Sequence, residues 1–137
     1  MIRLLTKNDY SDYLNLISEL KPTFFTLEQF QHTLSKLKNN IEIWVLEENG
    51  ILISSGTIIF EDKFIHNISV CGHIEDIIVK KEWRQKGYSK ILINQLVKRC
   101  EEKGCYKIIL DCVSELNEYY SKFGFENKNI QMSKYYN

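Results

Sequence analysis

The sequence lacks several features that mark whole classes of proteins. It has a single proline, Pro22, and no apolar run near the ~20 residues that span a membrane. Lysine plus arginine and aspartate plus glutamate each total 18, so no excess of basic charge is available to attract nucleic acid. No basic-then-apolar leader opens the chain. We therefore expect one domain over residues 1–137, cytoplasmic, with neither nucleic acid nor membrane as a partner.

Metal and disulfide motifs are also missing. The four cysteines contain no C-x-x-C pair, and the three histidines add no spacing typical of zinc sites. We expect the cysteines to be reduced and mostly buried, and no metal to be bound.

What the chain does have is regular hydrophobic patterning, which predicts a mixed α/β sheet. Thr26 and Gln29 have the spacing of a helix capping box, and Asn49-Gly50 is a strong hairpin turn. Residues 61–63 suggest a polar turn. In chain order we expect helices over 9–20 and 26–37, strands over 41–48, 51–60, 64–70 and 73–79, a helix over 89–103, a strand over 105–112, a short helix over 114–122 and an extended, aromatic tail over 125–136.

The most informative local feature is the loop Arg84-Gln85-Lys86-Gly87-Tyr88-Ser89 between the apolar strand 73–79 and the next helix. Free N–H groups at a helix N-terminus bind phosphate, and Gly87 lets the backbone approach an anion. Arg84 and Lys86 add positive charge, and the Ser89 hydroxyl can cap the helix or bond a phosphate oxygen. A plain strand-to-helix loop with solvated basic residues remains the alternative.

This loop resembles the acetyl-CoA signature of the GNAT superfamily, whose pattern ends in glycine or alanine where this chain has Ser89. The blocks 72–79, 104–112 and 119–125 together resemble the glucosamine 6-phosphate N-acetyltransferases, and Lys63-Phe64-Ile65-His66 resembles their substrate segment. The likeness is dense from about residue 56 to 132. It implies a GNAT fold, with a mixed central β-sheet flanked by helices, and acetyl-CoA as co-substrate.

The resemblance also implies a reaction: acetyl transfer from acetyl-CoA to the amine of D-glucosamine 6-phosphate, giving the N-acetyl sugar phosphate used to make UDP-N-acetylglucosamine. We expect direct transfer in a ternary complex, because no cysteine stands in a known nucleophile pattern. The cofactor-binding residues implied are Ile77, Ile78, Val79, Arg84, Gln85, Lys86, Gly87, Tyr88, Ser89, Asn117, Tyr120 and Lys122. A backbone N–H near Ile77 to Val79 would serve the oxyanion.

Four side chains are candidates for the chemistry. Tyr120 matches the family tyrosine beside the thiol sulfur, although without that match the residue favours a core aromatic. Glu75 and Asp76 lie in an otherwise apolar strand, where unpaired carboxylates are costly. Neighbours on a strand point to opposite faces, so one site uses both only through backbone contacts or a bulge. By resemblance these two and Asp111 orient the amine and remove its proton; which is the base stays open, and each could instead form a salt bridge or cap.

Two departures from the family bear on the ligands. The family's C-terminal arginine, which grips the sugar phosphate, has no counterpart, and Lys134 lies one residue before its position. Leu116 replaces a cofactor-contacting asparagine, with Asn117 following it. The predicted substrate-binding residues are Lys63, Phe64, Ile65, His66, Glu75, Asp76, Asp111 and Lys134.

Two other activities stay open, a GNAT enzyme for another amine and a non-catalytic acyl-CoA-binding module. The resemblance further implies a homodimer that exchanges its C-terminal strands, although the aromatic tail would also be able to close its own sheet.

Overall fold

The computed structural model describes residues 1–136 and is built around one five-stranded sheet. The pairs from β1 to β4 are antiparallel, and β5 is parallel to β4. The sheet is therefore mixed, as the sequence predicted. Its strands lie side by side in chain order: β1 (Ile2–Leu4), β2 (Ile41–Glu48), β3 (Ile51–Lys63), β4 (Ser69–Val79) and β5 (Lys107–Ile109).

Eight helical segments connect and follow these strands. Within residues 1–136, none of them is both long and apolar enough to cross a membrane. In chain order they are η1 (Lys7–Asp9), α1 (Tyr10–Ile17), α2 (Leu27–Lys36), α3 (Ile65–Ile68), η2 (Lys81–Trp83), α4 (Tyr88–Glu102), η3 (Ser114–Leu116) and α5 (Asn117–Ser121).

Two predicted pieces of local chemistry are confirmed. The Thr26 hydroxyl accepts from the Gln29 backbone N–H at 3.1 Å, and the Gln29 side chain accepts from the Thr26 N–H at 2.9 Å. This reciprocal pair is the capping box that starts α2. Asn49 and Gly50 have φ of 51° and 77°, the left-handed backbone that a two-residue hairpin between β2 and β3 requires.

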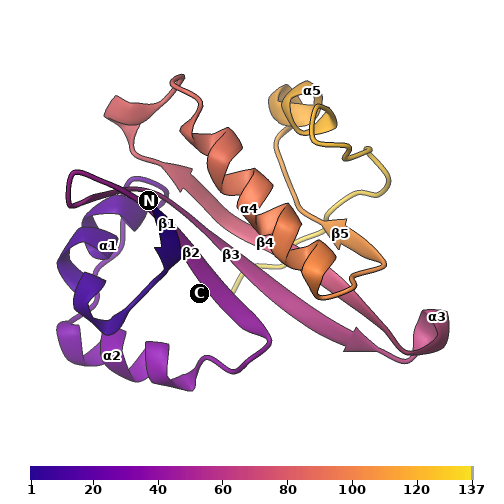
Figure 1. Cartoon of the computed structure of the whole chain (residues 1–137), viewed down its shortest axis with the longest axis horizontal. Coiled ribbons are helices and arrows are strands. Elements are labelled where there is room, and N and C mark those ends of the chain that lie inside the picture. Colours follow the sequence, from indigo (N-terminus) through magenta and orange to yellow (C-terminus); the bar gives the residue numbers. More distant parts are fainter. Residues whose placement is uncertain (137) are drawn as a thin grey trace.

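Alternate side chains of the strands pack into two apolar cores. Val45 of β2 packs with Leu16 of α1 and Phe30 of α2. Its neighbour Trp44 packs against the other cluster, which contains Leu96 of α4. Figure 1 shows the resulting layers, with α4 along one face of β3 and β4 and the first two helices grouped at the β1–β2 side. This alternation is why β3 is buried over most of its length.

The hairpin that joins β3 and β4 is longer than predicted. The turn expected over 61–63 and the extended segment expected over 64–70 are both wrong, because β3 continues to Lys63 and β4 begins at Ser69. Cross-strand contacts stabilise the extra length, among them Glu61 with His73 at 2.9 Å. The reversal at α3 is made by three consecutive residues with positive φ: His66, Asn67 and Ile68.

The two ends of the chain also differ from the expectation. The hydrophobic pattern did not predict β1, whose three residues pair with β2 from Ile2 with Leu46 to Leu4 with Trp44. The strand predicted over 105–112 contains only three residues of strand, and the tail over 125–136 pairs with no strand in the described chain. A strand needs a partner, and the tail finds none among residues 1–136.

The feature that creates the site is the separation of β4 from β5. The two strands are paired from Cys71 with Lys107 to His73 with Ile109, and no further. β4 nevertheless continues to Val79, paired with β3 on its other edge. Within the described residues, the edge of β4 that faces β5 is therefore unpaired from Ile74 onward.

Candidate active site

The loop singled out by the sequence leads from the end of β4 into α4. Gly87 is the N-cap of α4, with φ of 86°, and a Cβ built on it would meet nothing within 4 Å. The loop surface is therefore open at the helix N-terminus, as an anion site requires. Capping of the helix, one of the two roles expected for the Ser89 hydroxyl, is wrong, because Ser89 lies inside the first turn and its hydroxyl is hydrogen-bonded to the hydroxyl of Tyr119.

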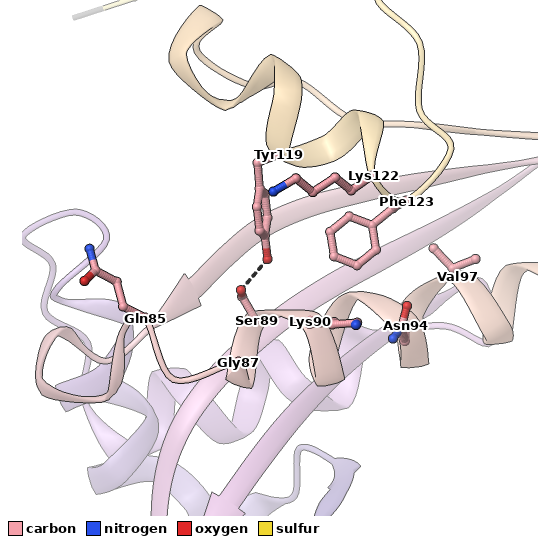
Figure 2. Close-up of a pocket in the computed structure, with 9 residues that line it drawn as sticks. All are labelled: Gln85, Gly87, Ser89, Lys90, Asn94, Val97, Tyr119, Lys122 and Phe123. Carbon is pink, nitrogen blue, oxygen red and sulfur yellow. Dashed lines mark hydrogen bonds between the residues drawn. The ribbon is translucent and has the colours of Figure 1, made fainter.

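A groove of about 650 Å³ runs beside this loop, between α4 and α5. Figure 2 shows side chains from both helices converging on it, with the Tyr119 ring reaching from α5 to Ser89. Its wall is more apolar than polar but carries lysines at two places. The lining residues are Gln85, Gly87, Ser89, Lys90, Asn94, Val97, Tyr119, Lys122 and Phe123.

Four predicted cofactor-binding residues line this groove, namely Gln85, Gly87, Ser89 and Lys122, whereas others do not. Arg84 donates from Nε to the Val79 carbonyl at 2.9 Å and faces a second hollow with Glu19, Lys81 and Glu82. Lys86 and Tyr88 pack on the Trp83 ring, with Nζ and the tyrosine centroid each 5.5 Å from it. Asn117 and Leu116 are both exposed outside the groove.

Sequence reasoning missed five lining residues, for two different reasons. Lys90, Asn94 and Val97 follow the i, i+4, i+7 spacing of one helix face, so projecting the predicted helix beyond the loop would have found them. Tyr119 and Phe123 come from α5, and no local pattern indicates that α5 lies against α4.

Tyr120, the predicted acid, is 9% exposed and lies next to Tyr119 on α5. Its ring meets those of Tyr119 and Phe125 edge to face, at centroid distances of 5.3 and 6.2 Å. Burial raises the pKa of Tyr120, and the neighbouring Tyr119 and Cys112 raise it further. The phenol is therefore kept in its protonated form, which a proton donor requires.

A bulge, one of the two alternatives that the sequence left open, is present in β4. Asp76 and Ile77 together oppose Gly56 of β3, and Asp76 has φ of 52°. Glu75 pairs with Thr57, and the side chains of paired residues lie on the same face of the sheet. The next residue, Ile58, packs on the α4 face, so Thr57 and Glu75 lie on the opposite face. There Asp76 lies near enough to Tyr13 of α1 to help raise the pKa of that tyrosine. The bulge thus allows two successive carboxylates to serve one region.

Asp111 joins this pair from the chain beyond β5. Burial raises the pKa of the Glu75 carboxyl, and the negative charges of Asp111 and Asp76 raise it further, while His73 lowers it. The three predicted carboxylates are therefore electrostatic neighbours at the place where β4 and β5 separate. A raised pKa favours Glu75 over an ordinary surface carboxylate as a proton acceptor.

The predicted substrate segment 63–66 is not brought to these carboxylates. Lys63 pairs with Ser69, which lies six residues before Glu75, or about 20 Å along the strand. Lys63 contacts Glu61 at 3.3 Å, and the His66 ring lies 4.4 Å from that of Tyr106. Figure 1 shows this end of the hairpin, at α3, projecting from the molecule, where Phe64 is 91% exposed and Ile65 is exposed as well.

Lys134 lies in the exposed tail, with Nζ 5.7 Å from the Tyr136 ring.

The cysteines and possible metal ligands give no competing site. All four cysteines are free, two are buried, and burial raises the pKa of Cys100 to about 12. In the described part of the chain, no three His, Cys, Asp or Glu side chains gather to hold a metal ion.

Comparisons with known proteins agree with this architecture. Residues 8–125 match the model of the Acetyltransferase (GNAT) family. The chain is 36% identical to glucosamine 6-phosphate N-acetyltransferase of Arabidopsis thaliana, over 90% of this chain and 87% of that protein. It is 38% identical to glucosamine 6-phosphate N-acetyltransferase 1 of Dictyostelium discoideum, over 92% and 82%. The crystal structure of the Arabidopsis enzyme superposes with a TM-score of 0.96 at 35% identity, covering 100% of this chain and 98% of that one.

Proposed function

The chain belongs to the acetyltransferase (GNAT) family, and within it we propose that the protein acetylates the amine of D-glucosamine 6-phosphate, with acetyl-CoA as the donor. The products are N-acetyl-D-glucosamine 6-phosphate and CoA, and the sugar product feeds the synthesis of UDP-N-acetylglucosamine. One observation carries the assignment: the chain matches, over nearly its whole length, relatives that are named for this reaction. Its free thiols suit an enzyme of the cytoplasm.

The groove between α4 and α5 suits the donor. Its apolar wall suits the less polar part of the donor. Its two lysines and the open N-terminus of α4 suit the pyrophosphate. When bound, acetyl-CoA supplies the acetyl group as a thioester. Gln85, Gly87 and Lys122 would hold it, together with Lys90 and Asn94 from the next turns of α4.

Four side chains and the unpaired edge of β4 each have a separate role in the proposed transfer. Glu75 accepts a proton from the ammonium form of the sugar, because its raised pKa makes it a better base than an ordinary carboxylate. Asp76 and Asp111 hold the cationic amine by their negative charge. The unpaired edge of β4 offers backbone N–H groups to the carbonyl oxygen. As the bond from nitrogen to the acetyl carbon forms and the carbon–sulfur bond breaks, Tyr120 donates its phenolic proton to the departing sulfur. The nitrogen loses two protons in all: the second restores the Tyr120 phenol through solvent, and the one held by Glu75 is released to solvent.

A second chain completes the acceptor site in this proposal. Residues 63–66 lie about 20 Å along β4 from Glu75 and cannot reach the carboxylates of their own chain. The tail residues Ile130, Met132, Tyr135 and Tyr136 are strongly exposed, and exposed apolar side chains gathered in one segment are typical of a protein–protein contact. We therefore propose a homodimer in which the hairpin tip and Lys134 of one protomer serve the sugar phosphate of the other.

Thiol release with two sugars tests the function. The protein is incubated with acetyl-CoA and either glucosamine 6-phosphate or glucosamine, and CoA is followed as free thiol. We expect a much higher kcat/KM for the phosphorylated sugar. Equal values would contradict the assignment of a phosphorylated sugar as the acceptor and favour another amine. The missing C-terminal arginine would then explain why the phosphate gives no advantage. CoA binding without turnover on any amine would favour a non-catalytic module.

A further inference from the structure

The hydroxyl of Tyr119 and the hydroxyl of Ser89 form a hydrogen bond that joins α5 to the first turn of α4. Figure 2 shows the Tyr119 ring descending from α5 across the groove to reach Ser89. Among residues 1–136, no other side-chain hydrogen bond links these two helices. The Tyr119 ring also meets the rings of Tyr120 and Phe123, at centroid distances of 5.3 and 5.4 Å.

α5 depends on such a contact for its position. It contains five residues, Asn117–Ser121, and a helix this short has little stability of its own. Its first residue and the preceding η3 are exposed, so few apolar contacts hold it at that end. A single well-placed hydrogen bond to α4 therefore has a large share in fixing its orientation.

Tyr120 is the next residue on this short helix. Because Tyr119 and Tyr120 are adjacent and their rings are 5.3 Å apart, holding the first restrains the second. The side-chain hydroxyl of Tyr120 has no hydrogen-bond partner within the described residues, so it is positioned by packing and by the helix that carries it. An alanine or glycine at position 89, as in the family pattern, would remove the anchor.

We infer that Ser89 and Tyr119 are a positioning pair: their hydrogen bond fixes α5 against α4 and so places the Tyr120 hydroxyl at the departing thiol. This inference rests on the proposed acetyl transfer, in which Tyr120 is the proton donor. It gives Ser89 a role different from direct contact with phosphate, and it gives Tyr119 a role that sequence analysis did not assign.

A double-mutant cycle with Ser89→Ala, Tyr119→Phe and the double variant tests the pair. Each single variant should lower kcat about three- to tenfold, since a typical hydrogen bond is lost, with a much smaller change in KM for acetyl-CoA. The double variant should lose no more than either single one, because both changes break the same bond. Ser89→Thr retains the hydroxyl and should recover most of the loss seen in Ser89→Ala.

The control is Ser121→Ala, which removes a serine hydroxyl that bonds the Asn117 carbonyl within α5 at 2.8 Å. It should leave kcat unchanged. A loss equal to that of Ser89→Ala would overturn the inference, because any weakening of α5 would then suffice. Additive losses in the double variant would also overturn it. So would a rise in KM for acetyl-CoA with Ser89→Ala alone, which would indicate a phosphate contact.

A measurement without turnover separates this inference from the proposed function. Amide hydrogen exchange in residues 117–121 should be faster by the same factor in both single variants than in the parent protein. If the parent protein does not acetylate the sugar, the proposed function fails, and exchange still decides whether Ser89 and Tyr119 hold α5. Unchanged exchange in both variants would overturn the positioning role.

Discussion

Burial raises the pKa of Glu75 and the carboxylate of Asp111 raises it further, although Asp111 lies beyond the end of β5 and Glu75 lies where β4 has no partner on that edge. The last registered pair is His73 with Ile109, two residues before each of them. The separation of β4 and β5 therefore does more than open space for a ligand. It also places two like charges on either side of that space, where a cationic amine relieves their repulsion.

Glu75→Gln is the first prediction. It should lower kcat/KM by about 10²-fold, the usual contribution of a general base. In the parent protein, activity should fall as pH drops through a pKa above the ordinary 4.5, because the base is then protonated. The pH profile of kcat/KM with glucosamine 6-phosphate measures both effects. Glu115→Gln, an exposed carboxylate on η3, is the matched control. An unaltered profile in Glu75→Gln would transfer the role of base to another group.

The same substitution should change stability in the opposite direction. Because folding raises the pKa of Glu75, the ionised carboxylate destabilises the folded chain at neutral pH. Below the ordinary pKa of 4.5 the carboxyl is protonated in the folded and the unfolded chain, and this cost is absent. Glu75→Gln should therefore raise the free energy of unfolding at pH 7, and the gain should shrink toward pH 4. Urea unfolding at several pH values checks this, and a gain independent of pH would contradict it.

Tyr120→Phe is the second site prediction. It removes the proton donor and should lower kcat about 10²-fold while acetyl-CoA binding is retained. Because the pKa of Tyr120 is raised above 10, the parent enzyme should lose no activity from this group between pH 7 and 9. Steady-state kinetics and calorimetric titration with acetyl-CoA measure the two quantities. Turnover equal to that of the parent at every pH would remove the leaving-group role.

Lys134→Met tests the phosphate contact. As a point charge, Lys134 lacks the paired geometry of arginine, so its loss should raise KM for glucosamine 6-phosphate severalfold and leave that for glucosamine unchanged. Lys128→Met is the control, because Lys128 lies in the same exposed tail and is paired with Glu126 at 3.0 Å. Equal effects of the two substitutions would show only a general charge attraction.

Gly72→Ala concerns the packing of α4 on β4. A Cβ at Gly72 would lie 2.6 Å from the sulfur of Cys100, which is fully buried. Such overpacking should destabilise the protein by about 1–3 kcal/mol. Adding Cys100→Ala removes the obstructing sulfur, so the double variant should be less destabilised than the sum of the single changes. Urea unfolding of all four proteins measures this, and strict additivity would contradict it.

Local chemistry was predictable from the sequence, and long-range placement was not. Thr26 with Gln29, and Asn49 with Gly50, behave as predicted because their partners are three residues away or fewer. Strand geometry offered a bulge at Glu75 and Asp76 as one of two alternatives, and the register with Thr57, which decides it, is a long-range property. Tyr119 was missed because its partner Ser89 is thirty residues away, on an element whose neighbours no local pattern specifies.

The unpaired edge of β4 also bears on the handling of the protein. Strand edges without a partner pair with the edges of other molecules, and this one is unpaired where the acetyl-transfer site is proposed. A ligand that lies along this edge prevents such pairing. Any ligand that binds only the folded chain also raises its stability, and the effect grows with the concentration of the ligand. Purified without acetyl-CoA, the protein should therefore be more prone to aggregate and should melt at a lower temperature. The stability of the purified protein in storage should therefore depend on the concentration of acetyl-CoA kept with it.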